Sequence, residues 1–144
     1  MNLTKHFTLA EMTVSQSAAR DGIKNTPSAS QAENLRLLCE NILEPLRLRV
    51  RRPVVINSGF RSASVNRRIG GSNKSQHCKG EAADLIIPGM EVAEVAMLIR
   101  RMNLPYDQLI DEFGQWVHVS FSPRNRRQFL TSRYSGGQVV YKGA

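Results

Sequence analysis

The sequence predicts an α+β fold in which helices cover one face of a small, mostly antiparallel sheet. Apolar residues recur at helical spacing, three or four residues apart, within residues 28–49 and 91–102. Four short runs rich in apolar and β-branched residues predict strands. These runs are 53–60, 82–87, 108–113 and 116–121. A chain of 144 residues with 41% apolar side chains has room for one core, so we expect residues 1–144 to form a single domain.

The segment before the main helix predicts short helical turns joined by loops. Thr8 and Glu11 have the spacing of a capping box, which marks the start of a helix. A second short helix is predicted from Ser15 to Arg20, and Gly22 ends it.

The main helix is predicted from Ser28 to about Arg49. Ser28 and Gln31 have the spacing of a capping box. An apolar stripe follows, made of Leu35, Leu38, Ile42 and Leu46. Pro45 removes one backbone hydrogen bond and should kink or shorten the helix. Cys39 lies beside the stripe, and we expect it to be a small buried residue.

Strand alternation predicts which side chains share a face. In the last strand of a predicted hairpin, which turns at Gly114-Gln115, His118 lies on the polar face. Asp84 lies within an otherwise apolar run, where an unpaired carboxylate would be costly and a cation would remove that cost. Residues 124–127 predict a turn or an exposed basic patch, and residues 138–141 predict a final edge strand.

Composition favours an anionic partner and argues against several functional classes. The net charge is +8 and the pI about 10.2. The arginine clusters are scattered and no nucleic-acid-binding motif is present, so we expect no nucleic-acid partner. No apolar run approaches the roughly 20 residues of a membrane span, and the N-terminus lacks the pattern of a signal peptide. We therefore expect synthesis in a cytoplasm and no stable membrane association.

Three residues have the chemistry of a zinc site. The chain contains three histidines, and His77 and His118 lie where a strand is expected to begin or run. Together with Asp84 they match the three His or carboxylate ligands of catalytic zinc. Spacing alone leaves open the alternative of ordinary histidines without a metal. His6 lies outside these stretches, and the side chain of Cys78 should diverge from its neighbour His77.

Two stretches carry a resemblance to a known family: Ser75-x-His77-x-x-Gly80-x-Ala82-x-Asp84 and Trp116-Val117-His118-Val119-Ser120. They resemble the zinc signature of the D-Ala-D-Ala carboxypeptidase family of metallopeptidases, which includes phage cell-wall endopeptidases and the Hedgehog signalling domain. Weaker similarity extends back to Phe7. The resemblance implies a Hedgehog/DD-peptidase-like fold and a Zn²⁺ cofactor. It also implies that His77, Asp84 and His118 are the metal ligands.

The resemblance also implies roles for other residues. Ser58-Gly59-Phe60-Arg61-Ser62 is similar to a family segment whose arginine, here Arg61, binds a substrate carboxylate. Ser75 resembles a serine that hydrogen bonds near the substrate, although capping of its own backbone is a comparable alternative.

Glu112 matches the catalytic base of the Hedgehog branch, six residues before His118. Other members place the acid three residues before the last histidine, where this chain has Gln115, which cannot ionise. Asp111 is the alternative acid. We expect it to point away from Glu112 and into solvent.

The function that the resemblance implies is zinc-dependent hydrolysis of peptidoglycan stem peptides by a monomer. The bond is either L-alanyl–D-glutamate, cut by an endopeptidase, or D-alanyl–D-alanine, cut by a carboxypeptidase. A compact chain of this kind resembles a phage lysis enzyme, made in the bacterial host cytoplasm and acting on the cell wall after release. The alternative is a non-catalytic zinc-containing binding module of a phage tail or host-interaction protein.

Overall fold

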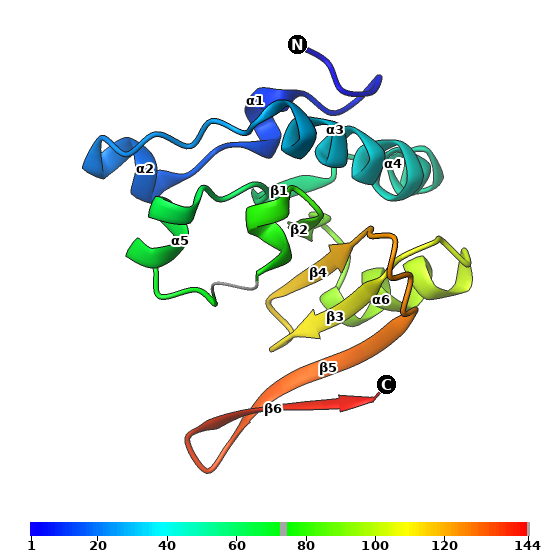
Figure 1. The fold of residues 1–144 in the computed structure, drawn as a ribbon. Helices are drawn as coiled ribbons and strands as arrows, with labels where there is room; N and C mark the ends of the chain where they lie inside the picture. Colours follow the sequence, from blue (N-terminus) through cyan, green and yellow to red (C-terminus); the bar gives the residue numbers. More distant parts are fainter. Residues whose placement is uncertain (73–74, 144) are drawn as a thin grey trace.

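The computed structural model describes residues 1–72 and 75–143, which form a six-stranded sheet with helices packed against it (Figure 1). The helices are α1 (Leu9–Met12), α2 (Gln16–Asp21), α3 (Ala29–Leu38), the π-helical turn η1 (Cys39–Leu43), α4 (Glu44–Val50), α5 (Ala63–Arg68), the 3₁₀ turn η2 (Gln76–Lys79) and α6 (Val92–Arg101). The strands are β1 (Val55–Ser58), β2 (Ala82–Ile86), β3 (Gln108–Glu112), β4 (Trp116–Ser120), β5 (Gln128–Ser135) and β6 (Gln138–Gly143). The predicted α+β class is confirmed.

The sheet is mixed, which corrects the expectation of a mostly antiparallel one. Its strand order is β1-β2-β4-β3-β5-β6, and β5 runs parallel to β3. The connection after β4 is tied to the start of β3, where Asp107 accepts hydrogen bonds from the backbone N–H groups of Arg126 and Gln128. The chain therefore enters β5 from the same end as β3. β6 then returns antiparallel as the predicted edge strand.

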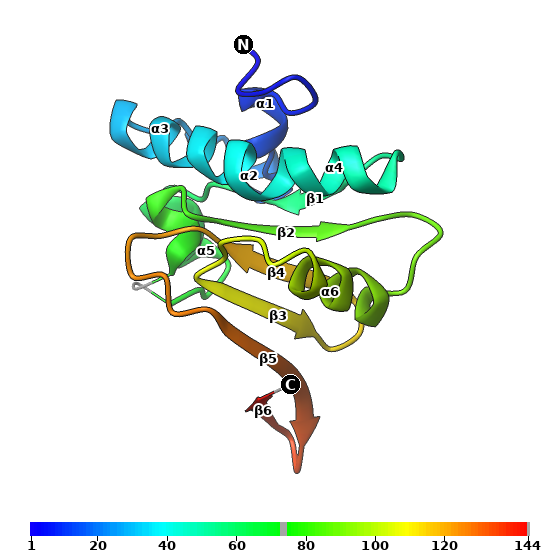
Figure 2. The same cartoon turned by 90° about the vertical axis from the view of Figure 1, so that its right-hand side faces the viewer.

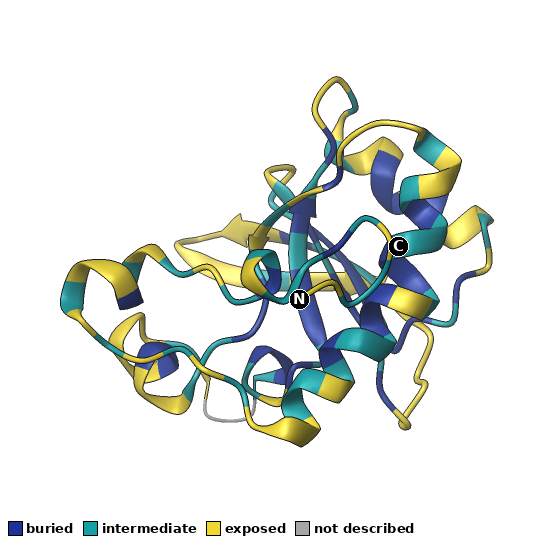
Figure 3. Cartoon of the chain, turned by 90° about the horizontal axis from the view of Figure 1, so that it is seen from above, coloured by how far each residue is buried: buried dark blue, intermediate teal, exposed yellow. Residues whose placement is uncertain are grey.

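The main helix and α6 pack against the same face of the sheet (Figure 2). Leu38 and Ile42 of the main helix and Ile99 of α6 share one buried cluster with Leu85 and Val119 of the sheet. Each fully buried Leu or Ile stabilises the fold by about 1.5–3 kcal/mol relative to an exposed one. Figure 3 shows the buried positions along the central strands and on the inner sides of these helices. The opposite face of the sheet is left free to carry polar side chains.

The main helix continues past Pro45 by changing its hydrogen-bond register. Both predicted capping boxes are present, at Thr8 and at Ser28. The π-helical turn η1 lies directly before Pro45, and the N–H of Glu44 donates to the carbonyl of Cys39. A wider turn accommodates the missing proline N–H without ending the helix. Cys39 is fully buried, as predicted, and burial raises the pKa of its thiol to about 12.

A tight turn sets the register of the β3–β4 hairpin. Phe113 and Gly114 have φ values of 58° and 67°, and the N–H of Gln115 donates to the carbonyl of Glu112. Two consecutive positive φ values are typical of a type I′ turn, so the turn is centred one residue earlier than predicted. The resulting register pairs Glu112 with Trp116 and brings His118 beside Asp84 of β2.

None of the helices within residues 1–72 and 75–143 has the length and apolar character that crossing a membrane requires.

Candidate metal centre

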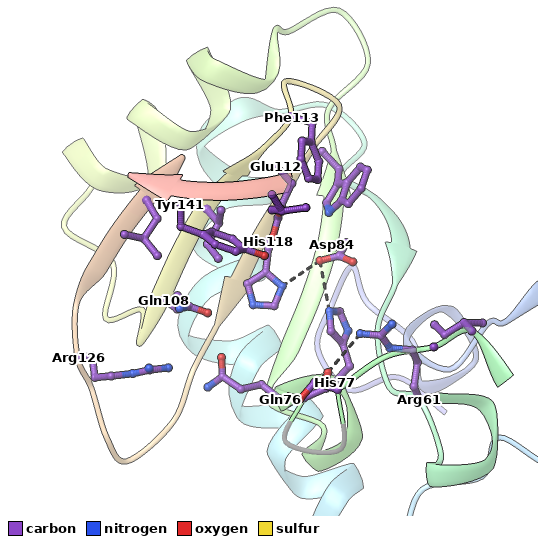
Figure 4. A pocket seen from close by; sticks show the side chains of 18 of the residues that line it. Arg61, Gln76, His77, Asp84, Gln108, Glu112, Phe113, His118, Arg126 and Tyr141 are labelled. Carbon is purple, nitrogen blue, oxygen red and sulfur yellow. Dashed lines mark hydrogen bonds and ion pairs between the residues drawn. The ribbon is translucent and has the colours of Figure 1, made fainter. Parts of the chain in front are cut away.

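A cleft of about 1000 Å³ lies on the face of the sheet opposite the helices. Figure 4 shows His77, Asp84 and His118 converging within it, with Arg61 on one side and Glu112 on the other. The sheet register positions two of the three, because Asp84 of β2 pairs directly with His118 of β4. The two side chains therefore leave the sheet on the same face.

The structure brings together the three residues that the sequence predicted as metal ligands. Ligand atoms of His77, Asp84 and His118 all lie within 4.8 Å of one another. Asp84 Oδ1 is 3.0 Å from His118 Nδ1 and 3.3 Å from His77 Nε2. Nitrogen and oxygen donors in this number and combination are those of catalytic zinc sites.

His77 lies on a single 3₁₀ turn, η2, and not at the start of a strand as expected. Ser75 caps this turn by accepting from the N–H of His77, and Gly80 ends it with a φ of 75°. Helix α3 supports the turn, because the amides of Gln31 and Asn34 donate to the carbonyls of Cys78 and Lys79. A Cβ at position 80 would lie 2.4 Å from the carbonyl oxygen of Gln31, so only glycine fits this close approach.

A backbone carbonyl fixes the tautomer of His77. His77 Nδ1 lies 2.7 Å from the carbonyl oxygen of Gly59, and a carbonyl can only accept, so Nδ1 carries the hydrogen. Nε2 therefore presents its lone pair toward Asp84. Gly59 can approach this closely because it packs on the backbone of Met12, whose carbonyl a Cβ at position 59 would meet at 2.3 Å. Such an outer hydrogen bond orients the ring of a metal-binding histidine.

The electrostatics of the three residues fit a divalent cation. Burial raises the pKa of Asp84, but the imidazoles of His118 and His77 beside it outweigh burial and hold that pKa well below its usual range. The lone pair of a neutral His77 faces a carboxylate oxygen, an arrangement that a cation between them makes favourable. The donor set thus suits Zn²⁺, with Asp84 ionised.

The other candidate ligands lie elsewhere in the described part of the chain. His6 pairs with Glu44 of α4, with Nδ1 2.5 Å from Oε2. Cys78 is a free, partly buried thiol and does not join the group of His77, Asp84 and His118. This agrees with the expectation that its side chain diverges from that of His77.

Glu112 lines the cleft from the end of β3, on the same face as His118. Its Oε2 accepts a hydrogen bond of 2.5 Å from the hydroxyl of Ser132 in β5. Asp111 points to the opposite face, as predicted, but the expectation that it is solvated was wrong. It is buried, and its carboxylate accepts from the N–H of Gly114 and from Arg133. Gln115 is exposed in the turn.

Arg61 and Ser75 contact each other at the edge of the cleft. Arg61 Nη2 donates to Ser75 Oγ at 3.2 Å, and the buried Nε of Arg61 has no hydrogen-bond partner among the described residues. Burial lowers the pKa of Arg61, while the negative charge of Asp84 opposes this shift. Ser75 caps η2, as one of the two alternatives for it predicted, and it also lines the cleft, while its hydrogen bonding near the substrate stays a prediction.

Aromatic side chains from the β3–β4 turn and the last two strands form a wall on the Glu112 side of the cleft. Tyr134 stacks on Phe113 with ring centroids 4.6 Å apart, and Trp116 meets Phe113 edge to face at 6.0 Å. Burial and the negative charge of Glu112 raise the pKa of Tyr141. Among these aromatic residues, only Trp116 belongs to a stretch that the sequence associates with the site. Tyr134 and Tyr141 reach the cleft because β5 pairs with β3 and β6 with β5, and no local sequence pattern predicts the first of these pairings.

A buried carboxylate behind the cleft, Asp107, was not identified from the sequence. It has no exposed surface and accepts hydrogen bonds from the Gln76 side chain and from the backbone and guanidinium of Arg126. Burial raises the pKa of Asp107, but the hydrogen bonds from Arg126 prevail and lower it to about 2. Asp107 thus links η2, which carries His77, to the loop that leads into β5.

Replacing Asp107 with asparagine is expected to lower the free energy of unfolding by about 1–3 kcal/mol at neutral pH, because the amide cannot accept from all of these donors. A folded-state pKa below the unfolded value of about 3.9 stabilises the protein above that value. This stabilisation is lost as the pH falls toward about 2. Urea unfolding at several pH values should therefore show the difference between the two proteins narrowing below about pH 4.

The matched control for Asp107 is Asp21→Asn, since Asp21 pairs with Arg68 at the surface. A surface pair contributes about 0–1 kcal/mol, so this variant should differ little from the wild type. A difference for Asp107→Asn that stays constant from neutral to acidic pH would contradict the proposed ionised state of the carboxylate.

Comparisons with known proteins agree with this geometry. A sequence model of the family described as Peptidase M15 matches residues 5–120, a range that contains the whole group of His77, Asp84 and His118. Zinc D-Ala-D-Ala carboxypeptidase from Streptomyces albus G is 47% identical to this chain over 34 residues. That match covers 24% of this chain and 13% of the relative, so the chain spans a small part of the relative's length. Strands β5 and β6 lie outside the range matched by the family.

Proposed function

Because this chain belongs to the peptidase M15 family, we propose that it is a zinc-dependent peptidase that hydrolyses stem peptides of bacterial peptidoglycan. The observation that carries the proposal is the convergence of His77, Asp84 and His118 in a cleft that Glu112 and Arg61 also line. The similarity to the zinc D-Ala-D-Ala carboxypeptidase of Streptomyces albus G supports the substrate class. We assign this activity to residues 1–144 acting as one domain and as a monomer.

In this proposal His77, Asp84 and His118 hold the zinc ion. A zinc ion held there would lower the pKa of a coordinated water and would polarise the carbonyl of the scissile peptide bond. The chain's own contribution is to hold the donors in place. The Gly59 carbonyl orients the ring of His77, and the sheet register orients His118 and Asp84.

Arg61 anchors the substrate in this proposal. A guanidinium remains charged and forms two parallel hydrogen bonds with a carboxylate. Arg61 lines the cleft with His77, Asp84 and His118, and its contact with Ser75 holds the guanidinium at the cleft edge. Both candidate substrates carry a free carboxylate near the bond to be cut. Binding it at Arg61 directs the scissile bond over the three metal-binding residues.

Glu112 moves the proton. Its carboxylate takes a proton from the attacking water while the water oxygen bonds to the carbonyl carbon. It then gives that proton to the amine nitrogen as the carbon–nitrogen bond breaks. The oxygen that does this is Oε1, because Oε2 is engaged by Ser132. The other carboxylate that lines the described cleft, Asp84, is a proposed metal ligand, and Asp111 points away.

The finer proposal is a phage lysis enzyme that acts as an L-alanyl–D-glutamate endopeptidase or a D-alanyl–D-alanine carboxypeptidase. The net charge of +8 favours retention on an anionic cell wall. The many exposed arginines match a polymer partner better than a specific nucleic-acid site, for which the chain has no motif.

The test is digestion of purified peptidoglycan with the zinc-loaded protein, followed by mass analysis of the released ends. We expect products whose formation a chelator stops and added zinc restores, since loss of the metal removes the activated water. New N-terminal D-glutamate identifies the endopeptidase, and loss of terminal D-alanine identifies the carboxypeptidase.

The contrary result is one zinc bound per chain with no chelator-sensitive product from several wall types. That result would overturn the enzymatic proposal and favour a zinc-containing binding module.

A further inference from the structure

The C-terminal hairpin of β5 and β6 contributes to the cleft although it lies outside the family match at residues 5–120. Leu130 and Tyr134 of β5, and Val139 and Tyr141 of β6, line the cleft. In Figure 4, Tyr141 lies on the same side of the cleft as Glu112. The hairpin therefore lies close enough to contact Glu112, the residue proposed as the catalytic base.

One row of paired residues crosses four strands at the position of Glu112. Trp116 of β4 pairs with Glu112 of β3, Glu112 with Ser132 of β5, and Ser132 with Tyr141 of β6. Paired residues on neighbouring strands share a face, so Ser132 stands directly beside Glu112. Ser132 is fully buried, whereas Glu112 and Tyr141 reach the cleft. The serine thus forms part of the floor between them.

The contact between Ser132 and Glu112 has a defined direction. Ser132 Oγ lies 2.5 Å from Glu112 Oε2. A general base must be ionised, and a carboxylate only accepts, so the hydroxyl donates its hydrogen to Oε2. A hydrogen bond to an ionised carboxylate is stronger than one between two neutral groups. Among the described residues, Ser132 is the side chain that hydrogen bonds the Glu112 carboxylate, and Oε1 stays free.

We propose that Ser132 is a positioning residue that holds Glu112 with its free oxygen directed at the metal-binding residues, so that the C-terminal hairpin is part of the active site. A glutamate has several rotatable bonds, and only some rotamers bring Oε1 toward His118. The hydrogen bond from Ser132 to Oε2 selects among these rotamers before the substrate binds. Correct placement of a catalytic group accounts for much of its effect on rate. The inference rests on the proposed role of Glu112 as the base.

The test compares three substitutions at position 132 in the zinc-loaded chain of 144 residues. Ser132→Ala removes the donor and should lower kcat by about 10–100-fold, the usual cost of an outer hydrogen-bond partner, with little change in KM. Ser132→Thr keeps the hydroxyl and suits a strand, so it should restore most of kcat. Ser132→Cys fills the buried position but is only a weak donor, so it should show the same fall in kcat that is expected for Ser132→Ala. The cysteine variant therefore supplies the test if the alanine variant fails to fold.

Thr131→Ala is the matched control, because Thr131 is the neighbouring hydroxyl on β5 and points to the other face of the sheet. It should keep the kcat of the wild type. Zinc content and melting temperature are measured for every variant, so that an effect on folding is separated from an effect on turnover.

The inference is overturned if an active wild-type protein and its folded Ser132→Cys variant share the same kcat, or if Ser132→Thr is as slow as the cysteine variant. A wild-type protein with bound zinc and no turnover is a different result, which overturns the proposed function and this role with it.

Discussion

Replacing Glu112 with glutamine is expected to stop turnover while leaving the metal in place. The amide has the shape of the carboxylate but cannot take a proton from water, and loss of a general base costs about 10²–10⁴-fold in kcat. Glu112 is not one of the three converging ligands, so zinc content should stay at the wild-type level. Peptide hydrolysis and metal analysis on the same preparation measure both effects.

Gln115→Ala is the matched control for this experiment. Gln115 occupies the place, three residues before His118, at which other members of the family carry their acid, and here it is exposed in the hairpin turn. Its removal should leave kcat unchanged. A Glu112→Gln variant with the wild-type rate would show that the base lies elsewhere and that the assignment of roles in the hairpin is wrong.

Replacing His118 with alanine is expected to remove metal and activity together. Zinc would be left with two protein ligands in place of three, below the number found in catalytic sites. The loss of affinity should exceed the about 100-fold that removal of an outer partner costs. Metal analysis after dialysis against a weak chelator, with hydrolysis measured in parallel, should show both falling to background.

His6→Ala provides the comparison for the histidine experiment. His6 pairs with Glu44 of α4 and is not among the converging ligands. This variant should keep its zinc and its rate, although loss of the ion pair can lower its melting temperature. Retention of zinc and activity by His118→Ala would instead overturn the ligand assignment.

The features that the sequence predicted well depend on short-range patterns. The capping boxes at Thr8 and Ser28, the stripe on the main helix and the alternation that turns His118 away from the core are all local. The grouping of His77 with Asp84 and His118 came from spacing joined to a family resemblance. Spacing alone could not distinguish it from ordinary histidines.

The features that the sequence did not reveal depend on contacts between distant segments. No short turn joins β5 to its parallel partner β3, so no local sequence signal predicts β5 or the position of Ser132. Asp107 is a buried acid whose donors, Gln76 and Arg126, lie far from it along the chain. The sequence predicts Asp111 in solvent because no local pattern indicates that Arg133 of β5 donates to its carboxylate.

The contact between helix α3 and the turn that carries His77 couples the affinity for a metal to the local unfolding of α3. Gln31 and Asn34 hold the carbonyls of Cys78 and Lys79, and Gly80 packs on the backbone of α3. An opening of the first turns of α3 therefore removes two hydrogen bonds that support the turn carrying His77. Since an ion that binds only the closed form stabilises that form, a bound metal also suppresses the opening of a helix that contributes none of its ligands.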